Sequence, residues 1–294
     1  MPNTDIALPV PLTPPAAAPA PANPARRPVL KPLRPRRLPQ SRLWPTWATV
    51  VIQLALLLGA LGFWQLAADS GLIDSFFWSK PSAIFATLDT FIVEGDAGID
   101  AWYTFRATLI GFFLGTAAGT GIGLSFWWSR NYAAVMQPYI IAFESTPKLA
   151  LAPLIILVFG VGLASKVAIG TALTVVVSTL TTYAGVKAVD SDNERLLYSL
   201  GARRWQVFTK LVVPSVLPWG ISVLRVNIGL ALTGSIVGEF ISSQHGLGRE
   251  IMYAGQTYDI ALVWVAVMVL STLSVIMYVG VSWLEKTLLK GVKR

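Results

Sequence analysis

Five ionisable side chains lie inside long apolar stretches of this chain, where a charged group usually has a function. They are Arg106, Glu144, Lys148, Arg225 and Glu239. A charge in hydrocarbon is costly, so such residues usually face a cavity or a partner, or lie at the membrane surface. We treat Glu144, Lys148, Arg225 and Glu239 as candidates for lining the path of a polar solute.

The spacing of these residues leaves more than one role open. Glu144 and Lys148 are four residues apart and can pair on one helix face, although Pro147 distorts the turn between them. A structural ion pair and a place on the solute path both fit. Arg225 can extend to the membrane surface or contact an anion, and Arg106 and Glu239 lie near span ends, where an interfacial position fits.

Residues for other chemistry are scarce. The chain has one histidine, His245, and no cysteine, which excludes a disulfide framework and a thiolate metal site. We find no paired histidines, no glycine-rich phosphate loop with its lysine and no nucleophile elbow. The sequence therefore predicts no metal, no cofactor and no catalytic site.

Composition predicts an all-α integral membrane protein. Of the 294 residues, 54% are hydrophobic and 13% charged, with a mean hydropathy of +0.61. The net charge of +8 is spread over flanks and loops, which argues against nucleic-acid binding. With about 20 residues needed per crossing, six transmembrane helices are predicted, at roughly 47–68, 102–127, 134–160, 166–187, 218–240 and 260–284.

Basic residues predict the orientation of these spans. Seventeen lysines and arginines lie in the N-terminal tail, near Arg130, in the 187–210 loop and at the C-terminus. Positive residues favour the cytoplasmic side, so both termini are predicted to be cytoplasmic.

The spans suggest four regions. Residues 1–43 hold most of the prolines and are predicted to be a disordered, basic cytoplasmic tail; a signal anchor or a cleaved leader is the alternative. Residues 44–100 carry the first span and a short helix from Pro81, either at the periplasmic interface or as a buried linker. Residues 101–290 form the core with five spans, and 285–294 a basic cytoplasmic tail.

Glycine and proline mark two spans. A glycine at every fourth position of the second span makes a smooth ridge, for tight helix packing or for sliding during a transport cycle; these are Gly111, Gly115, Gly119 and Gly123. Three prolines in the third span predict a kinked helix that lines a cavity; these are Pro138, Pro147 and Pro153.

Residues 190–218, here called the polar segment, interrupt two apolar stretches. Asp190 or Asp192 can cap a first short helix, and Gly201 can end it in a left-handed conformation. A second helix begins near Ala202 and is predicted to end at Pro214. This elbow can lie on the membrane surface or dock into a groove of a soluble partner.

These residues resemble a known family. Gly201-Ala202 followed by Pro214 and Pro218 is similar to the EAA loop of bacterial ATP-binding-cassette importer permeases, in the nitrate/sulfonate/taurine branch. Further matching motifs, in order, are Lys80-Pro81-Ser82, 147–162, Ser165-Lys166, Gly185-Val186, Gly238-Glu239-Phe240 and Gly246-Leu247-Gly248. The likeness covers about residues 75–290. One departure is Arg195 where the loop's glutamate is expected, followed by Leu196 and Leu197 instead of small residues; the adjacent Glu194 can substitute.

The resemblance implies a type I importer permease (MetI-like) fold of the bacterial inner membrane, with a cytoplasmic coupling helix. Two copies of the chain, a homodimer, would form the path in membrane lipid, with two ATPase subunits that hydrolyse ATP and a periplasmic or lipid-anchored substrate-binding protein. It places the ATPase contact on Glu194, Arg195, Leu196, Leu197, Gly201, Ala202, Arg203 and Pro214.

The sequence leaves alternatives open for the transported substrate and for the class of membrane protein. The branch handles small anions such as aliphatic sulfonates, taurine and nitrate, and similar permeases carry thiamine-pyrimidine precursors, bicarbonate or aromatic acids. We expect a sulfonate-type organic anion. An ATP-independent secondary carrier or channel is a different class, as is a membrane enzyme; a carrier would be expected to show an internal repeat, which the sequence lacks.

Overall fold

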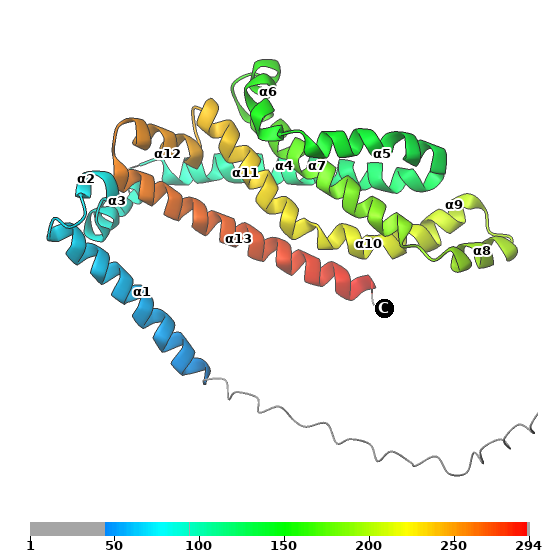
Figure 1. Cartoon of the computed structure of the whole chain (residues 1–294), viewed down its shortest axis with the longest axis horizontal. Coiled ribbons are helices and arrows are strands. Elements are labelled where there is room, and N and C mark those ends of the chain that lie inside the picture. The colour runs from blue at the N-terminus through cyan, green and yellow to red at the C-terminus, as the bar shows by residue number, and fades with distance from the viewer. Residues whose placement is uncertain (1–44, 94, 293–294) are drawn as a thin grey trace, which may run out of the picture. The chain divides into compact units, whose positions relative to one another are not determined.

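The computed structural model describes residues 45–93 and 95–292, and within them it contains helices and no strand (Figure 1). Contacts divide the chain into residues 1–52 and 53–294, so every contact given below lies within the second unit. The predicted tail 1–43 lies outside the described residues. In chain order the helices are α1 (Thr46–Asp69), α2 (Ser75–Trp78), α3 (Pro81–Val93), α4 (Ala97–Ser125), η2 (Phe126–Trp128), α5 (Arg130–Ser145), η3 (Lys148–Leu151), α6 (Ala152–Phe159), α7 (Leu163–Lys187), α8 (Ser191–Ser199), α9 (Arg204–Val207), η4 (Phe208–Val212), α10 (Val213–Ser222), α11 (Leu224–Ile241), α12 (Leu247–Gln256) and α13 (Ile260–Val292).

Five of these helices are long and apolar enough to cross a membrane. They are α1, α4 with η2, α7, α11 and α13, and the bent pair formed by α5 and η3–α6 makes a sixth if it counts as one span. Large apolar side chains such as Leu157 and Trp283 are exposed on these helices, as expected for surfaces that face lipid. The predicted all-α fold is confirmed for the described residues.

The kink predicted in the third span, 134–160, is confirmed. Its two halves are bent by 79° at a break that includes Pro147. Proline disfavours a helical conformation in the residue before it, and Thr146 is extended (ψ 133°). Two carbonyls before the break accept hydrogen bonds: Ala142 O accepts from Thr146 N and Oγ1 (3.1 and 2.9 Å), and Glu144 O accepts from Lys148 Nζ (2.9 Å).

The prediction that Pro214 ends a helix is wrong. Helical structure runs from Arg204 through α9, the π-helical turn η4 and α10 to Ser222. Pro214 lies in the first turn of α10, where its missing N–H is tolerated, and the wider π turn before it shifts the hydrogen-bond register. Two other boundaries differ: the helix predicted from 218 begins at Leu224, and α13 continues to Val292, so that most of the predicted tail 285–294 is helical.

The core of the second unit is the contact between α4, α7 and α11. Each ridge glycine of α4 is buried against α7. A Cβ added to Gly115 would lie 1.8 Å from Thr174 Oγ1, and one added to Gly119 would lie 2.3 Å from Val175 O. Gly170 of α7 contacts both neighbours: a Cβ on Gly111 of α4 would lie 3.4 Å from Gly170 Cα, and one on Gly234 of α11 would lie 2.8 Å from it. The three backbones therefore approach closely because these positions carry no side chain.

A polar contact joins the same three helices at the first turn of α11. Asn227 of α11 donates from Nδ2 to Thr116 Oγ1 on α4 (2.9 Å) and to Ser178 Oγ on α7 (2.6 Å). Asn227 and Ser178 are fully buried. Hydrogen bonds between membrane helices typically contribute about 0.6 to 2 kcal/mol, so this contact adds specificity to the glycine packing.

Apolar clusters attach α13 and α3 to this core. Phe112 of α4 and Ile228 of α11 pack with Met277 and Val281 of α13. Ile84 and Phe91 of α3 pack against Val265, at the other end of α13. The helix predicted from Pro81 is thus seated on protein along one side, with Phe85 and Ile92 exposed on the other.

Gly115→Ala tests the close approach of α4 and α7. The added methyl group meets Thr174 Oγ1 and Thr171 O, so we expect a loss of about 1–3 kcal/mol in stability, as for overpacked cores. The measurement is the thermal unfolding midpoint of the detergent-solubilised protein. Gly121→Ala is the matched control, since a Cβ there meets nothing within 4 Å; equal midpoints for the two variants would contradict the packing.

Candidate functional site

The first half of the polar segment is a short capped helix. Asp190 accepts a hydrogen bond from Asp192 N (2.8 Å) and is the N-cap of α8. The helix ends in a Schellman turn, in which Ala202 N donates to Leu197 O and Gly201 N to Tyr198 O, each at 3.0 Å. Gly201 has φ +82°, the left-handed conformation that the sequence predicts there.

The turn presents apolar side chains to the outside. Leu196, Leu200 and Trp205 are exposed, with Leu200 at 74%. Beside them is a hollow of about 260 Å³ lined by Leu197, Leu200, Gly201, Ala202, Gln206 and Lys210. An exposed apolar edge beside basic side chains is suited to contact with a partner.

An aromatic cluster fixes the second half of the polar segment to the end of α4. The Arg204 guanidinium lies over the rings of Trp127 and Trp128, 5.4 and 5.3 Å from their centroids, and donates to Trp128 O. Trp205 and Phe208 pack on Trp128 with ring centroids 6.0 and 5.3 Å away. A guanidinium on aromatic faces contributes about 0.5–2 kcal/mol, so this contact attaches the polar segment to the end of α4.

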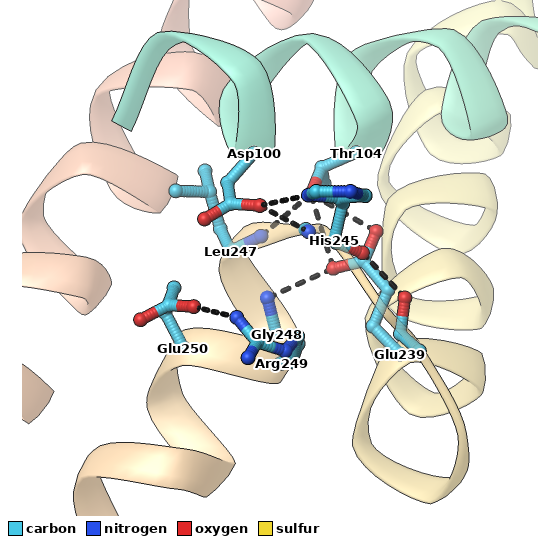
Figure 2. A network of polar contacts seen from close by, with 10 residues as sticks. Asp100, Thr104, Glu239, His245, Leu247, Gly248, Arg249 and Glu250 are labelled. Atoms are coloured by element: carbon cyan, nitrogen blue, oxygen red, sulfur yellow. Dashed lines mark hydrogen bonds and ion pairs between the residues drawn. The ribbon is translucent and has the colours of Figure 1, made fainter. Parts of the chain in front are cut away.

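The opposite end of α4 carries a buried polar cluster, here called the Glu239 network. Asp100 and Thr104 project from α4 toward the start of α12, where Glu239 of α11 also points (Figure 2). Asp100 accepts from Gly246 N (2.7 Å), Thr104 Oγ1 accepts from Leu247 N (3.0 Å), and Glu239 accepts from Gly248 N (2.8 Å). Thr104 Oγ1 in turn donates to Glu239 Oε1 (2.9 Å). Three side chains thus satisfy the first N–H groups of α12, which a helix cannot satisfy itself.

The glycines of this loop make room for the network. Gly246 has φ +126°, and a Cβ there would lie 2.4 Å from the Glu239 carboxyl carbon. A Cβ on Gly248 would lie 2.8 Å from Glu239 Cβ. The motif Gly246-Leu247-Gly248 is therefore explained by contact with Glu239, and Leu247 between them is fully buried.

One titratable group of α12 borders the network. Glu250 pairs with Arg249 and is mostly buried. Burial raises the pKa of the Glu250 carboxyl above its ordinary value, the charge of Asp100 adds to the increase, and Arg249 opposes it.

Most of the helical core matches one known protein family. Residues 107–290 match the family model described as "Binding-protein-dependent transport system inner membrane component". The chain belongs to this family of inner-membrane transport permeases. The match covers the α4–α7–α11 core and the polar segment, and this family hydrolyses ATP in a separate subunit, so the permease is not itself an enzyme.

Individual relatives agree with the assignment. The permease is 33% identical to the formylaminopyrimidine transport permease ThiX of Halalkalibacterium halodurans over 63% of this chain and 74% of that one. It is 27% identical to the taurine transport permease TauC of Escherichia coli over 83% and 91%. In structure it resembles an inward-facing methionine ABC transporter with a TM-score of 0.57, at 17% identity over 66% of this chain and 95% of that one, which shows the type I importer permease fold.

The five predicted intramembrane charges occupy four places. Glu144 and Lys148 pair across the break at Pro147 (3.5 Å), and Arg225 pairs with Glu285 of α13. Glu239 is 2% exposed, and its carboxylate is held inside the protein by donors from α12 and Thr104. Arg106 is exposed, at the rim of a cavity described below.

Several residues of the site escaped the sequence analysis. Asp100 and Lys166 are not among the predicted intramembrane charges, yet both lie in the first turn of long helices and are buried. Thr104 and Asn227 are uncharged and stood out less, although an isolated asparagine in an apolar span is itself a signal for an interhelical hydrogen bond.

Seven of the eight predicted loop residues lie along the elbow, from Glu194 to Arg203. Glu194 to Leu197 are on α8, and Arg195 forms an exposed pair with Asp192 (3.5 Å). Arg203 is the N-cap of α9, whose backbone N–H donates to Gln206 Oε1 (2.7 Å). Pro214 is on α10, away from the turn.

Glu239→Gln tests the network. One carboxyl oxygen becomes an NH₂ group that cannot accept, so Gly248 N and Thr104 Oγ1 must share the single remaining acceptor oxygen. We expect a loss of about 1–3 kcal/mol in stability. Hydrogen–deuterium exchange of the solubilised protein should be faster at the start of α12. Glu144→Gln, an exposed carboxylate in a pair, is the control and should leave that exchange unchanged. Unaltered exchange in Glu239→Gln would show that the network does not hold α12.

Proposed function

We propose that this permease imports a small organic anion of the sulfonate type, driven by ATPase subunits that dock on the polar segment. The family implies an ATPase partner and a substrate-binding protein. The observation that carries the docking site is the exposed apolar edge around the Gly201 turn, joined to α4 through Arg204. ATPase closure would move the elbow and, through the aromatic cluster, the end of α4.

The proposal includes assembly and orientation. Two copies of this chain form the path and bind two ATPase subunits, with the polar segment and both termini in the cytoplasm. The family's usual place in an inner membrane, the basic flanks of the spans and the apolar helix surfaces support this arrangement. The Glu239 network then lies near the outer side, where a binding protein delivers substrate.

The path is proposed to pass the break between α5 and η3. Glu144 there is half-exposed, and Lys148 is bonded to it across the bend. Arg225 and Glu239 are engaged within the protein, which favours a structural part for both.

Two relatives bear on the substrate class. Similarity to the taurine permease over most of the chain favours a sulfonate. Similarity to a formylaminopyrimidine permease favours a neutral pyrimidine as the second candidate. Thermal-shift screening of the partner binding protein with taurine, alkanesulfonates and formylaminopyrimidine decides between them, and binding of the pyrimidine alone would overturn the anion proposal.

Gly201→Pro tests the docking elbow. Proline fixes φ near −65° and removes the N–H that donates to Tyr198 O, so the Schellman turn cannot form. We expect loss of the co-purifying ATPase subunit and of substrate uptake, with membrane insertion unchanged. Gly201→Asn is the matched control, because asparagine tolerates the left-handed conformation and a side chain there meets nothing within 4 Å. Full ATPase recruitment by Gly201→Pro would refute the coupling role.

A further inference from the structure

A cavity of about 350 Å³ lies beside the Glu239 network. Its walls come from three places: the first turns of α4, the start of α7 with the loop before it, and the loop that joins α11 to α12. The polar side chains among its lining residues are Tyr103, Arg106, Lys166, Ser243, Gln244 and His245. Its volume is in the range that holds a small organic molecule.

The charged groups that line the cavity are cationic. Arg106 and Lys166 belong to the lining, and no aspartate or glutamate does. Within the described residues, Arg106 makes no ion pair and its side chain has no hydrogen bond. An exposed guanidinium at a cavity rim, without a carboxylate partner, is free to bind an anion.

Lys166 supplies a second positive charge from the cavity wall. It is 4% exposed, and its ammonium donates to Gly162 O (2.9 Å) and Ser242 O (3.2 Å). An ammonium has three donors, so one remains beyond these two carbonyls. The N-terminus of α7 adds to this field, because its N-cap Gly162 lines the cavity and provides no side-chain cap.

The nearby carboxylates are committed elsewhere. Glu239 accepts from Thr104 and Gly248 N, and Asp100 accepts from Gly246 N and lies 3.7 Å from His245 Nδ1. Neither residue lines the cavity. Glu239 and Asp100 offset the positive charge of the buried Lys166 from behind the cavity wall, and neither pairs with Arg106 at the cavity opening.

Uncharged groups complete the shape of the cavity. The rings of Tyr103 and His245 stack with centroids 4.9 Å apart and form a flat wall. Ser243 donates to His245 O, which holds the loop between α11 and α12 in place. Gln244 adds amide donors to the lining.

We propose that this cavity binds the carboxylate or sulfonate group of a small organic anion, with Arg106 as its main ligand and Lys166 as a second positive charge. The inference deepens the proposed function and rests on it for the identity of the anion as cargo. The same chemistry could also come from an acidic side chain of the substrate-binding protein, and the experiment separates the two sources.

The test titrates methanesulfonate into the purified permease–ATPase complex in nanodiscs, without binding protein. Dimethyl sulfone, a neutral analogue of similar shape, is titrated in parallel at constant ionic strength in chloride. We expect a saturable rise of the unfolding midpoint with methanesulfonate and none with dimethyl sulfone. Arg106→Gln should weaken binding by about tenfold or more, since it removes a charge-assisted hydrogen bond.

Two comparisons make the result decisive. Lys80→Gln removes an exposed cation that pairs with Asp69 and does not line the cavity, so it should bind methanesulfonate as the unaltered complex does. Absence of a saturable shift, or an equal affinity in Arg106→Gln, would overturn the inference. This readout needs neither uptake nor docking of the binding protein. Anion binding can therefore be absent in a working importer, and it can be present in a complex that does not import.

Adding the binding protein identifies the source of the anionic group. If Arg106→Gln lowers uptake of the loaded anion but keeps the stimulation of ATPase activity by the binding protein, the ligand is the free anion. If the stimulation itself falls, with or without cargo, the ligand is an acidic side chain of the binding protein. Both outcomes support an anion site at Arg106, whereas unchanged uptake and unchanged stimulation contradict it.

Discussion

Contact between the backbones of α4, α7 and α11 is the constraint on which the rest of this permease depends. Gly115, Gly170 and Gly234 lie where any side chain would meet a neighbouring helix. Lipid offers no hydrophobic force to bring helices together, so close van der Waals packing and interhelical hydrogen bonds have to do so. Asn227 provides such bonds at the first turn of α11. Because α4 is held along most of its length, the groups at its two ends keep a fixed relation to each other.

Those two ends have different chemistry. At one end, Asp100 and Thr104 hold the start of α12 by accepting its backbone hydrogen bonds. At the other, Trp127 and Trp128 receive Arg204 of the polar segment. A helix of this length spans about 43 Å at 1.5 Å per residue. The same rigid element therefore touches both the segment proposed to meet the ATPase and the loop beside the Arg106 cavity.

Much of this could be predicted from the sequence, and the exceptions share a cause. Hydropathy identified the long helices, and the left-handed position of Gly201 followed from its place after a capped helix. Local patterns could not show that the helix would continue past Pro214. It does so because the π turn before Pro214 shifts the hydrogen-bond register, and that register depends on the preceding residues. Nor could local patterns show that Glu239 is buried, since its partners Thr104 and Gly248 come from other elements. Pairings across the fold, such as Arg225 with Glu285, are likewise invisible in spacing alone.

The break between α5 and η3 carries its own hydrogen-bond partners. Thr146 and Lys148 donate hydrogen bonds to the carbonyls of Ala142 and Glu144, just before the bend. The carbonyl of Phe143, four residues before Pro147, loses its helical donor because proline has no N–H. The bonds at Ala142 and Glu144 keep the last turn of α5 in place up to the break. Any rearrangement there is then expected to swing the two half-helices as intact bodies, with the bend acting as a preset joint.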